Sequence, residues 1–169
     1  GVNALEYSVN SGKETGVNDP EYLMKVESLV NFLRNQPNIS SVRSYTDVVK
    51  RLNQNFNEDD ESFYKVPNSE LEAAQYLFLY ELSLGYGLDL TDQINVDKSA
   101  LRVTANVSKT TTKGFLELDK KVQSWFDENA PELSTKSTGT SQVFSKISSR
   151  DVPAMLKGTG LALIGISFI

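Results

Sequence analysis

Two stretches of this chain alternate apolar and polar residues, and each is followed by apolar residues at helical spacing. Residues 5–9 and 101–107 show the alternation, whose period of two is typical of a strand with one buried face. Apolar residues then recur every three or four positions over 19–35 and 111–128, which predicts two helices with one apolar face each. The residues expected to form a core shared by these two helices are Val26, Leu29, Val30, Leu33, Leu118, Val122 and Trp125.

Shorter strands are expected near 39–45 and 135–140, so the pattern of strand, helix, strand occurs twice. This order predicts an α+β fold of the ferredoxin-like type, in which two βαβ halves place their helices on one face of an antiparallel sheet. Between the halves lies a segment with helical patterns, which is expected to be a helical insert. The predicted boundaries are 1–45 and 99–140 for the halves, 46–98 for the insert, and 141–169 for a final helix that leads into a membrane segment.

The end of the chain is apolar and carries no charge. After Lys157 the sequence reads GTGLALIGISFI, which is shorter than the about 20 residues that a membrane-spanning helix needs. We interpret this run as the beginning of a transmembrane helix, with Lys157 placed where a long cationic side chain can reach the bilayer interface. The alternative is a buried terminal strand or helix of a soluble domain, because short apolar runs are ambiguous.

Composition excludes several classes of function. The net charge is -5, and Lys and Arg are scattered along the chain, so nucleic acid is not an expected partner. The chain has no Cys and no His, which excludes thiolate nucleophiles, His-dependent triads and His-based zinc sites. The acidic stretch 55–61 spaces oxygen ligands as a calcium loop does, but Asp60 stands where the loop needs glycine. We therefore predict no enzyme activity, no metal and no cofactor.

A helix expected after residues 67–69 is the chemically unusual element. Its middle, YLFLY at 76–80, is apolar or aromatic on nearly every side, more than one core-facing stripe requires. Ordinary core packing explains such a helix, and so does a contact surface for a lipid-like substrate or a neighbouring subunit. The candidate contact residues are Tyr76, Leu77, Phe78, Tyr80, Leu84 and Tyr86.

Four segments together resemble a known family. They are VNDPE at 17–21, VRSYTDVVKRLN at 42–53, AQYLFLYEL at 74–82, and TGT at 138–140 ahead of the expected membrane helix. In this order they resemble the resistance-nodulation-division (RND) exporters. The most similar branch contains the hydrophobe and amphiphile exporters and is related to the mycobacterial large membrane proteins. The resemblance extends over nearly the whole chain, and none of the four segments is catalytic.

The resemblance implies the first extracytoplasmic loop domain of a proton-driven transporter, built like a ferredoxin-like porter subdomain. It implies export of hydrophobic or amphiphilic, lipid-like cargo, with the domain on the extracytoplasmic face of the cell membrane. The implied partners are the transmembrane helices and second extracytoplasmic loop of the same transporter, and other subunits of a homo-oligomer. The proton-carrying acidic residues of this superfamily lie in later helices, so no catalytic residue is carried over.

Two other classes of protein fit the same sequence features. A ligand-binding ectodomain of a membrane receptor is also an acidic α+β module beside a membrane helix. A protein-export accessory domain of the same superfamily binds unfolded chains instead of lipids. A signalling domain encoded in the full-length gene would favour the receptor, and cross-linking to a translocating polypeptide would favour the accessory domain.

Overall fold

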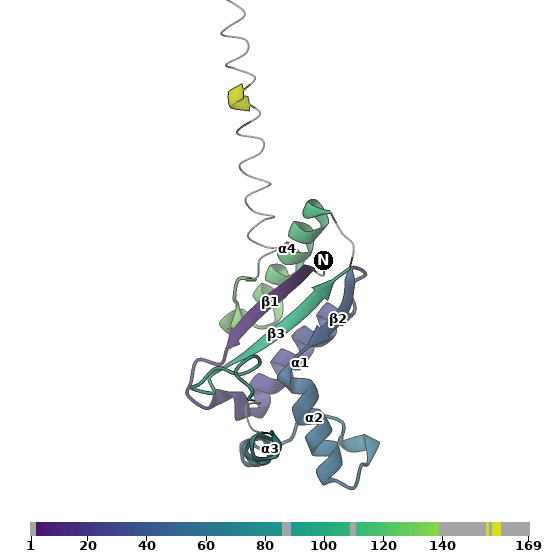
Figure 1. Ribbon diagram of the computed structural model, residues 1–169, viewed down its shortest axis with the longest axis vertical. Coiled ribbons are helices and arrows are strands. Elements are labelled where there is room, and N and C mark those ends of the chain that lie inside the picture. The colour runs from purple at the N-terminus through teal and green to yellow at the C-terminus, as the bar shows by residue number, and fades with distance from the viewer. Residues whose placement is uncertain (1–2, 86–88, 109–110, 139–154, 156, 160–169) are drawn as a thin grey trace, which may run out of the picture.

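The computed structural model describes residues 3–85, 89–108, 111–138, 155 and 157–159 (Figure 1). Its described part is a small mixed α+β domain with an antiparallel sheet, so the predicted α+β class is confirmed. The strands are β1 (Asn3–Asn10), β2 (Ile39–Arg43) and β3 (Ala100–Val107). The helices are α1 (Pro20–Arg34), α2 (Tyr45–Phe56), α3 (Glu70–Ser83) and α4 (Thr112–Asn129), with short 3-10 helices η1 (Gly16–Asn18), η2 (Glu61–Phe63) and η3 (Pro131–Leu133).

β3 lies in the middle of the sheet. Within the described residues the strand order is β1-β3-β2, and β3 runs antiparallel to both neighbours. Ala105 is opposite Leu5 on one side and Val42 on the other, so these apolar residues form one row across the sheet. β1 and β2 are therefore parallel to each other with β3 between them, and α1 connects them as a crossover.

One face of the sheet is buried and the other is open. On β1 the residues Leu5, Tyr7 and Val9 are fully buried, whereas Ser8 between them is exposed, and β3 alternates in the same way. In Figure 1 the sheet lies in front of α1 and α4, which cover its far side. The buried residues form one apolar cluster to which α2 and α3 also contribute. The helices expected in the insert therefore share the core of the sheet.

Among the described residues, the expected fourth strand is represented by one bridge. Thr138 pairs with Glu6 on the edge of β1 that faces away from β3, and two backbone hydrogen bonds of 3.2 and 2.7 Å join them. The helix expected from 141 onward falls mainly outside the described residues, as does most of the apolar run after Lys157. Over the described ranges, no helix combines the length and apolarity that crossing a bilayer requires.

Local side-chain caps set where the helices begin. Asp19 accepts a hydrogen bond from the Glu21 backbone N–H and Pro20 takes the first helical position, so α1 begins as its sequence predicts. The second strand is shorter than expected, because Ser44 accepts from the Thr46 N–H and begins α2. Tyr45, expected to continue that strand, is instead a buried residue of the first turn of α2.

The sequence predicts Trp125 in the core, but Phe126 occupies that position in the structure. α4 turns Phe115, Leu118, Val122 and Phe126 toward the sheet, at intervals of three and four residues. Trp125 is one position off this stripe, so it is half-buried at the edge, where its ring stacks on Phe32 at 5.9 Å. The remaining residues expected in the core shared by α1 and α4 are all buried.

Tyr22 links α1 to two strands. Its hydroxyl donates to the Val9 carbonyl at 2.7 Å and accepts from the Leu101 N–H at 3.1 Å, at a buried position. We expect Tyr22→Phe to lower the free energy of unfolding by about 2 kcal/mol, because each buried backbone group left unpaired costs about 1–3 kcal/mol. Urea unfolding followed by circular dichroism measures this. Tyr64→Phe, at an exposed ring, is the control, and an equal loss in both variants would contradict the assignment.

Candidate functional site

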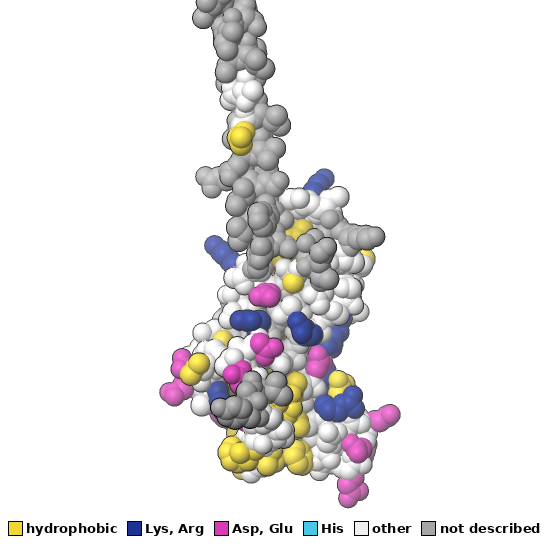
Figure 2. All heavy atoms as spheres, in the orientation of Figure 1, with side chains coloured by type: hydrophobic (Ala, Val, Ile, Leu, Met, Phe, Trp, Pro, Cys, Tyr) yellow, Lys and Arg dark blue, Asp and Glu magenta, His cyan; other side chains and the backbone are white. Residues whose placement is uncertain are grey.

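The candidate site is the side of α3 that faces away from the core. Four large apolar side chains of this helix are between 43% and 69% exposed, although the domain has a well-buried core elsewhere. Figure 2 shows hydrophobic side chains gathered in the region where Figure 1 places α3. An exposed apolar patch of this kind is a candidate for a binding surface. We call the four residues the α3 stripe: Leu71, Phe78, Leu79 and Leu82.

The structure divides the sequence-predicted contact residues between core and surface. Tyr76 and Leu77 are buried, and Tyr80 and Leu84 are half-buried against the core. Phe78 is exposed and belongs to the α3 stripe. Tyr86 lies outside the described residues. Any contact surface on this helix is therefore formed by Phe78 together with three leucines that the sequence analysis does not single out.

The spacing of the stripe is the signal that reveals those leucines. Leu71, Phe78 and Leu82 are separated by seven and four residues, which places them on one line along a helix. Ala73, Tyr76 and Leu77 lie on the opposite side and are buried. The helix is thus apolar on two opposed faces, which its sequence alone describes only as apolar all round.

Polar contacts fix the orientation of α3. Ser69 begins the helix by accepting from the Glu72 N–H at 3.2 Å. The Tyr76 hydroxyl donates to the Asn53 side-chain oxygen of α2 at 3.2 Å, and the Tyr76 ring stacks on Phe56 at 5.1 Å. These contacts determine which face turns inward, and the α3 stripe is the face that remains outside.

The charges around the α3 stripe are acidic. The helix itself contains Glu70, Glu72 and Glu81 and has no Lys or Arg. Glu81 pairs with Lys98 at 2.8 Å, and both side chains are about a third exposed, so this pair contributes little stability. The stripe therefore combines apolar side chains with the carboxylates of Glu70 and Glu72 at the start of the helix and the Glu81–Lys98 pair near its end, and we call these carboxylates the acidic rim.

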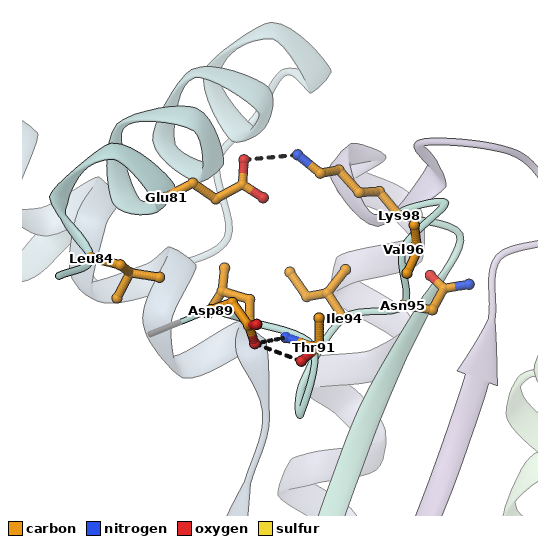
Figure 3. Close-up of a pocket in the computed structure, with 9 residues that line it drawn as sticks. Glu81, Leu84, Asp89, Thr91, Ile94, Asn95, Val96 and Lys98 are labelled. Carbon is orange, nitrogen blue, oxygen red and sulfur yellow. Dashed lines mark hydrogen bonds and ion pairs between the residues drawn. The ribbon is translucent and has the colours of Figure 1, made fainter. Parts of the chain in front are cut away.

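A hollow of about 330 Å³ lies where α3 ends, against the connection to β3 (Figure 3). Leu84 and Ile94 point into it in Figure 3, and Leu90 also lines it. The Glu81–Lys98 pair closes one side, as the dashed line in Figure 3 shows. This volume is at the lower limit of ligand pockets, so the hollow suits one apolar side chain or a short alkyl group.

A second hollow, of about 360 Å³, lies on the open face of the sheet beside the start of α2. Arg43 and Arg102 line it together with Glu6, Asp47 and Asp92. Charges of both signs meet there, so the hollow selects neither an anion nor a cation.

The ionisable groups of the described residues form no reactive cluster. In that part of the chain, no group of three or more His, Cys, Asp or Glu residues is placed to hold a metal ion. The tyrosines with strongly raised pKa values are Tyr7, Tyr22 and Tyr45, and burial is the main cause in each. Such shifts are those of core residues and do not point to acid–base chemistry.

Comparison with family models, with curated proteins and with solved structures gives no match. The α3 stripe and its acidic rim are therefore the observations from which a function is argued.

Proposed function

We propose that this chain is an extracytoplasmic, porter-type domain of an RND-type exporter, and that the α3 stripe contacts apolar cargo or a neighbouring part of the transporter. The observation that carries the proposal is the stripe itself. Leu71, Phe78 and Leu82 expose apolar surface on a helix whose other face already contributes fully to the core. Core packing therefore does not account for these side chains.

The proposal includes a ferredoxin-like arrangement of the sheet. Thr138 lies beside β1, so the order from edge to edge is the Thr138 segment, β1, β3 and β2. Two strand–helix–strand units in this order, with both helices on one face, are the pattern of that fold. The support is the strand order and the shared core of α1 and α4, in which Tyr22 contacts the carbonyl of Val9 and Phe126 packs on Tyr7.

Transport by the full-length exporter tests the proposal. We expect Phe78→Asp to reduce export of a hydrophobic substrate roughly tenfold, because burying a Phe side chain contributes about 1.5–3 kcal/mol and a carboxylate cannot be buried there unpaired. Efflux of a fluorescent amphiphile from cells, normalised to the amount of transporter in the membrane, is the measurement.

Ser124→Asp is the matched control, because it places the same charge on an exposed position of α4. Both variants of the 169-residue chain are expected to melt at the wild-type temperature, since neither position is buried. Wild-type efflux in the Phe78→Asp transporter would reject a functional contact at the stripe.

A further inference from the structure

We propose that the α3 stripe is the docking face for a single amphipathic helix whose apolar residues are flanked by Lys or Arg. This inference rests on the proposed function in taking the stripe as a contact surface, and it names the partner of that surface. The helix belongs to a partner protein and is defined by its chemistry, an apolar seam with cations on both flanks.

The spacing of the stripe fits a helix. Leu71, Gln75, Phe78 and Leu82 follow one another at intervals of four, three and four residues, the repeat that lets two helices pack along a continuous seam. All four positions are exposed. α3 has 14 residues, the length of two heptads, and is about 21 Å long, and the seam occupies positions 71–82 of it. Leu79 broadens it on one side.

Contacts on the opposite face of α3 hold the stripe in a fixed position before any partner binds. Ala73 and Leu77 are each 1% exposed, and Tyr76 is held by its hydrogen bond to Asn53 and its stacking on Phe56. A rigidly placed helix loses little freedom when a partner binds. Gln75 adds one polar group within the seam, a feature that fixes the register of paired helices.

Charge complementarity identifies the partner as cationic. Glu72 and Glu81 are nine residues apart, and their helical positions flank the seam on opposite sides. Glu81 is already paired with Lys98 at 2.8 Å, so Glu72, in the first turn of α3, carries the flanking charge that a partner meets. These flanking positions determine the choice of partner in paired helices. Because α3 carries no Lys or Arg, a helix with cations at the matching positions is favoured over one with carboxylates.

The same charges disfavour the other occupants. A second copy docked with its α3 parallel to this one brings Glu72 against Glu72, and anionic lipid headgroups meet the same repulsion. Uncharged apolar cargo gains nothing from the acidic rim. The basic amphipathic helix is the occupant that uses both the seam and its flanks.

Two designed peptides test the inference by titration calorimetry against the 169-residue chain in low salt. Both are helical and have leucine at the seam positions, and they differ in carrying either Lys or Glu at every flanking position. We expect the lysine peptide to bind at least tenfold more tightly than the glutamate peptide. Phe78→Asp is expected to weaken binding of the lysine peptide at least tenfold, and Glu72→Lys to reduce the preference between the peptides.

Glu128→Lys, an equal change of charge on α4, is expected to leave the preference intact. Equal affinities for the two peptides, or binding of neither, would overturn the inference. Self-association of the chain that Phe78→Asp abolishes, seen by analytical ultracentrifugation, would assign the stripe to a second copy instead. Stripe-dependent binding to anionic phosphatidylglycerol vesicles, with no preference between the peptides, would assign it to a bilayer.

These outcomes separate the inference from the proposed function. Selective binding of the lysine peptide together with normal efflux in the Phe78→Asp transporter would reject the export role and retain the helix-docking surface. Loss of efflux in that transporter together with equal binding of both peptides would reject the helix-docking surface and retain the export role.

Discussion

Phe126→Ala is expected to lower the free energy of unfolding by about 3–5 kcal/mol, the usual cost of truncating a fully buried Phe. The Phe126 side chain is fully buried on the face of α4 that packs against the sheet. Its ring lies 6.2 Å from that of Tyr7 and 5.5 Å from that of Trp125, measured between centroids. The truncation leaves a cavity between helix and sheet that neighbouring side chains fill only in part. Chemical denaturation followed by far-UV circular dichroism measures the loss.

Trp125→Ala is the matched control in the adjacent position. We expect it to cost less than about 2 kcal/mol, because the half-buried indole loses mainly its stacking on Phe32 and part of its apolar contact. A larger cost at Trp125 than at Phe126 would mean that α4 is rotated relative to the sheet, with Trp125 turned into the core.

Steep loss of stability above about pH 10 is the second large effect that we expect. Burial raises the pKa values of Tyr7, Tyr22 and Tyr45 well above the ordinary value of 10.0. For Tyr7, the charge of Asp119 and its hydrogen bond to the hydroxyl, at 3.3 Å, raise the pKa further. For Tyr45, the charges of Glu81 and Tyr80 act in the same direction after burial.

The sign of the pH effect follows from the pH at which the phenols lose their protons in the unfolded chain and in the folded domain. In the unfolded chain they ionise near pH 10, whereas in the folded domain they stay neutral to higher pH. Their contribution to stability is complete below pH 10 and is lost as the pH rises toward the folded-state pKa values. Within that pH range each phenol lowers the free energy of unfolding by about 1.4 kcal/mol per pH unit, so the three phenols together lower it by about 4 kcal/mol per pH unit.

Alkaline unfolding followed by circular dichroism and by tyrosinate absorbance tests this expectation. The tyrosinate signal of Tyr7, Tyr22 and Tyr45, obtained as the difference between the wild type and the Tyr→Phe variant at each position, should change together with the helical signal, because buried phenols ionise on unfolding. Tyr45→Phe removes a buried hydroxyl that has no hydrogen-bond partner among the described residues, and should shift the midpoint to higher pH. Tyr64→Phe at an exposed ring should leave the midpoint unchanged. Tyrosinate formation at Tyr7, Tyr22 or Tyr45 well before the loss of helical signal would contradict the buried positions.

Local patterns are sufficient to predict much of this fold. Leu5, Tyr7 and Val9 alternate with polar residues, and all three point into the core. Asp19-Pro20 predicts the start of α1, because both residues act through the helix's own backbone. Such features depend on neighbours in sequence, and sequence analysis identifies them for that reason.

Tertiary contacts determine which helix faces are buried where the local sequence patterns allow more than one choice. Phe126 and Trp125 are adjacent and both aromatic, and only the rotation of α4 against the sheet determines which of them is buried. On α3, apolar residues all around the helix do not reveal which face is inside. The bond from Tyr76 to Asn53, 23 residues earlier, helps to fix that choice. The α3 stripe is therefore a product of the packing of α2 against α3.

The bridge between Glu6 and Thr138 places the two terminal segments of the described domain side by side at one edge of the sheet. The two segments are antiparallel, so the chain at Thr138 runs toward the end of β1 at which Asn3 lies. Tethers attached to these two segments would therefore pull on one edge of the sheet and would not stretch the domain from end to end. α3 lies near the opposite end in Figure 1, so a rotation of the domain about that edge would move the α3 stripe further than the strand ends.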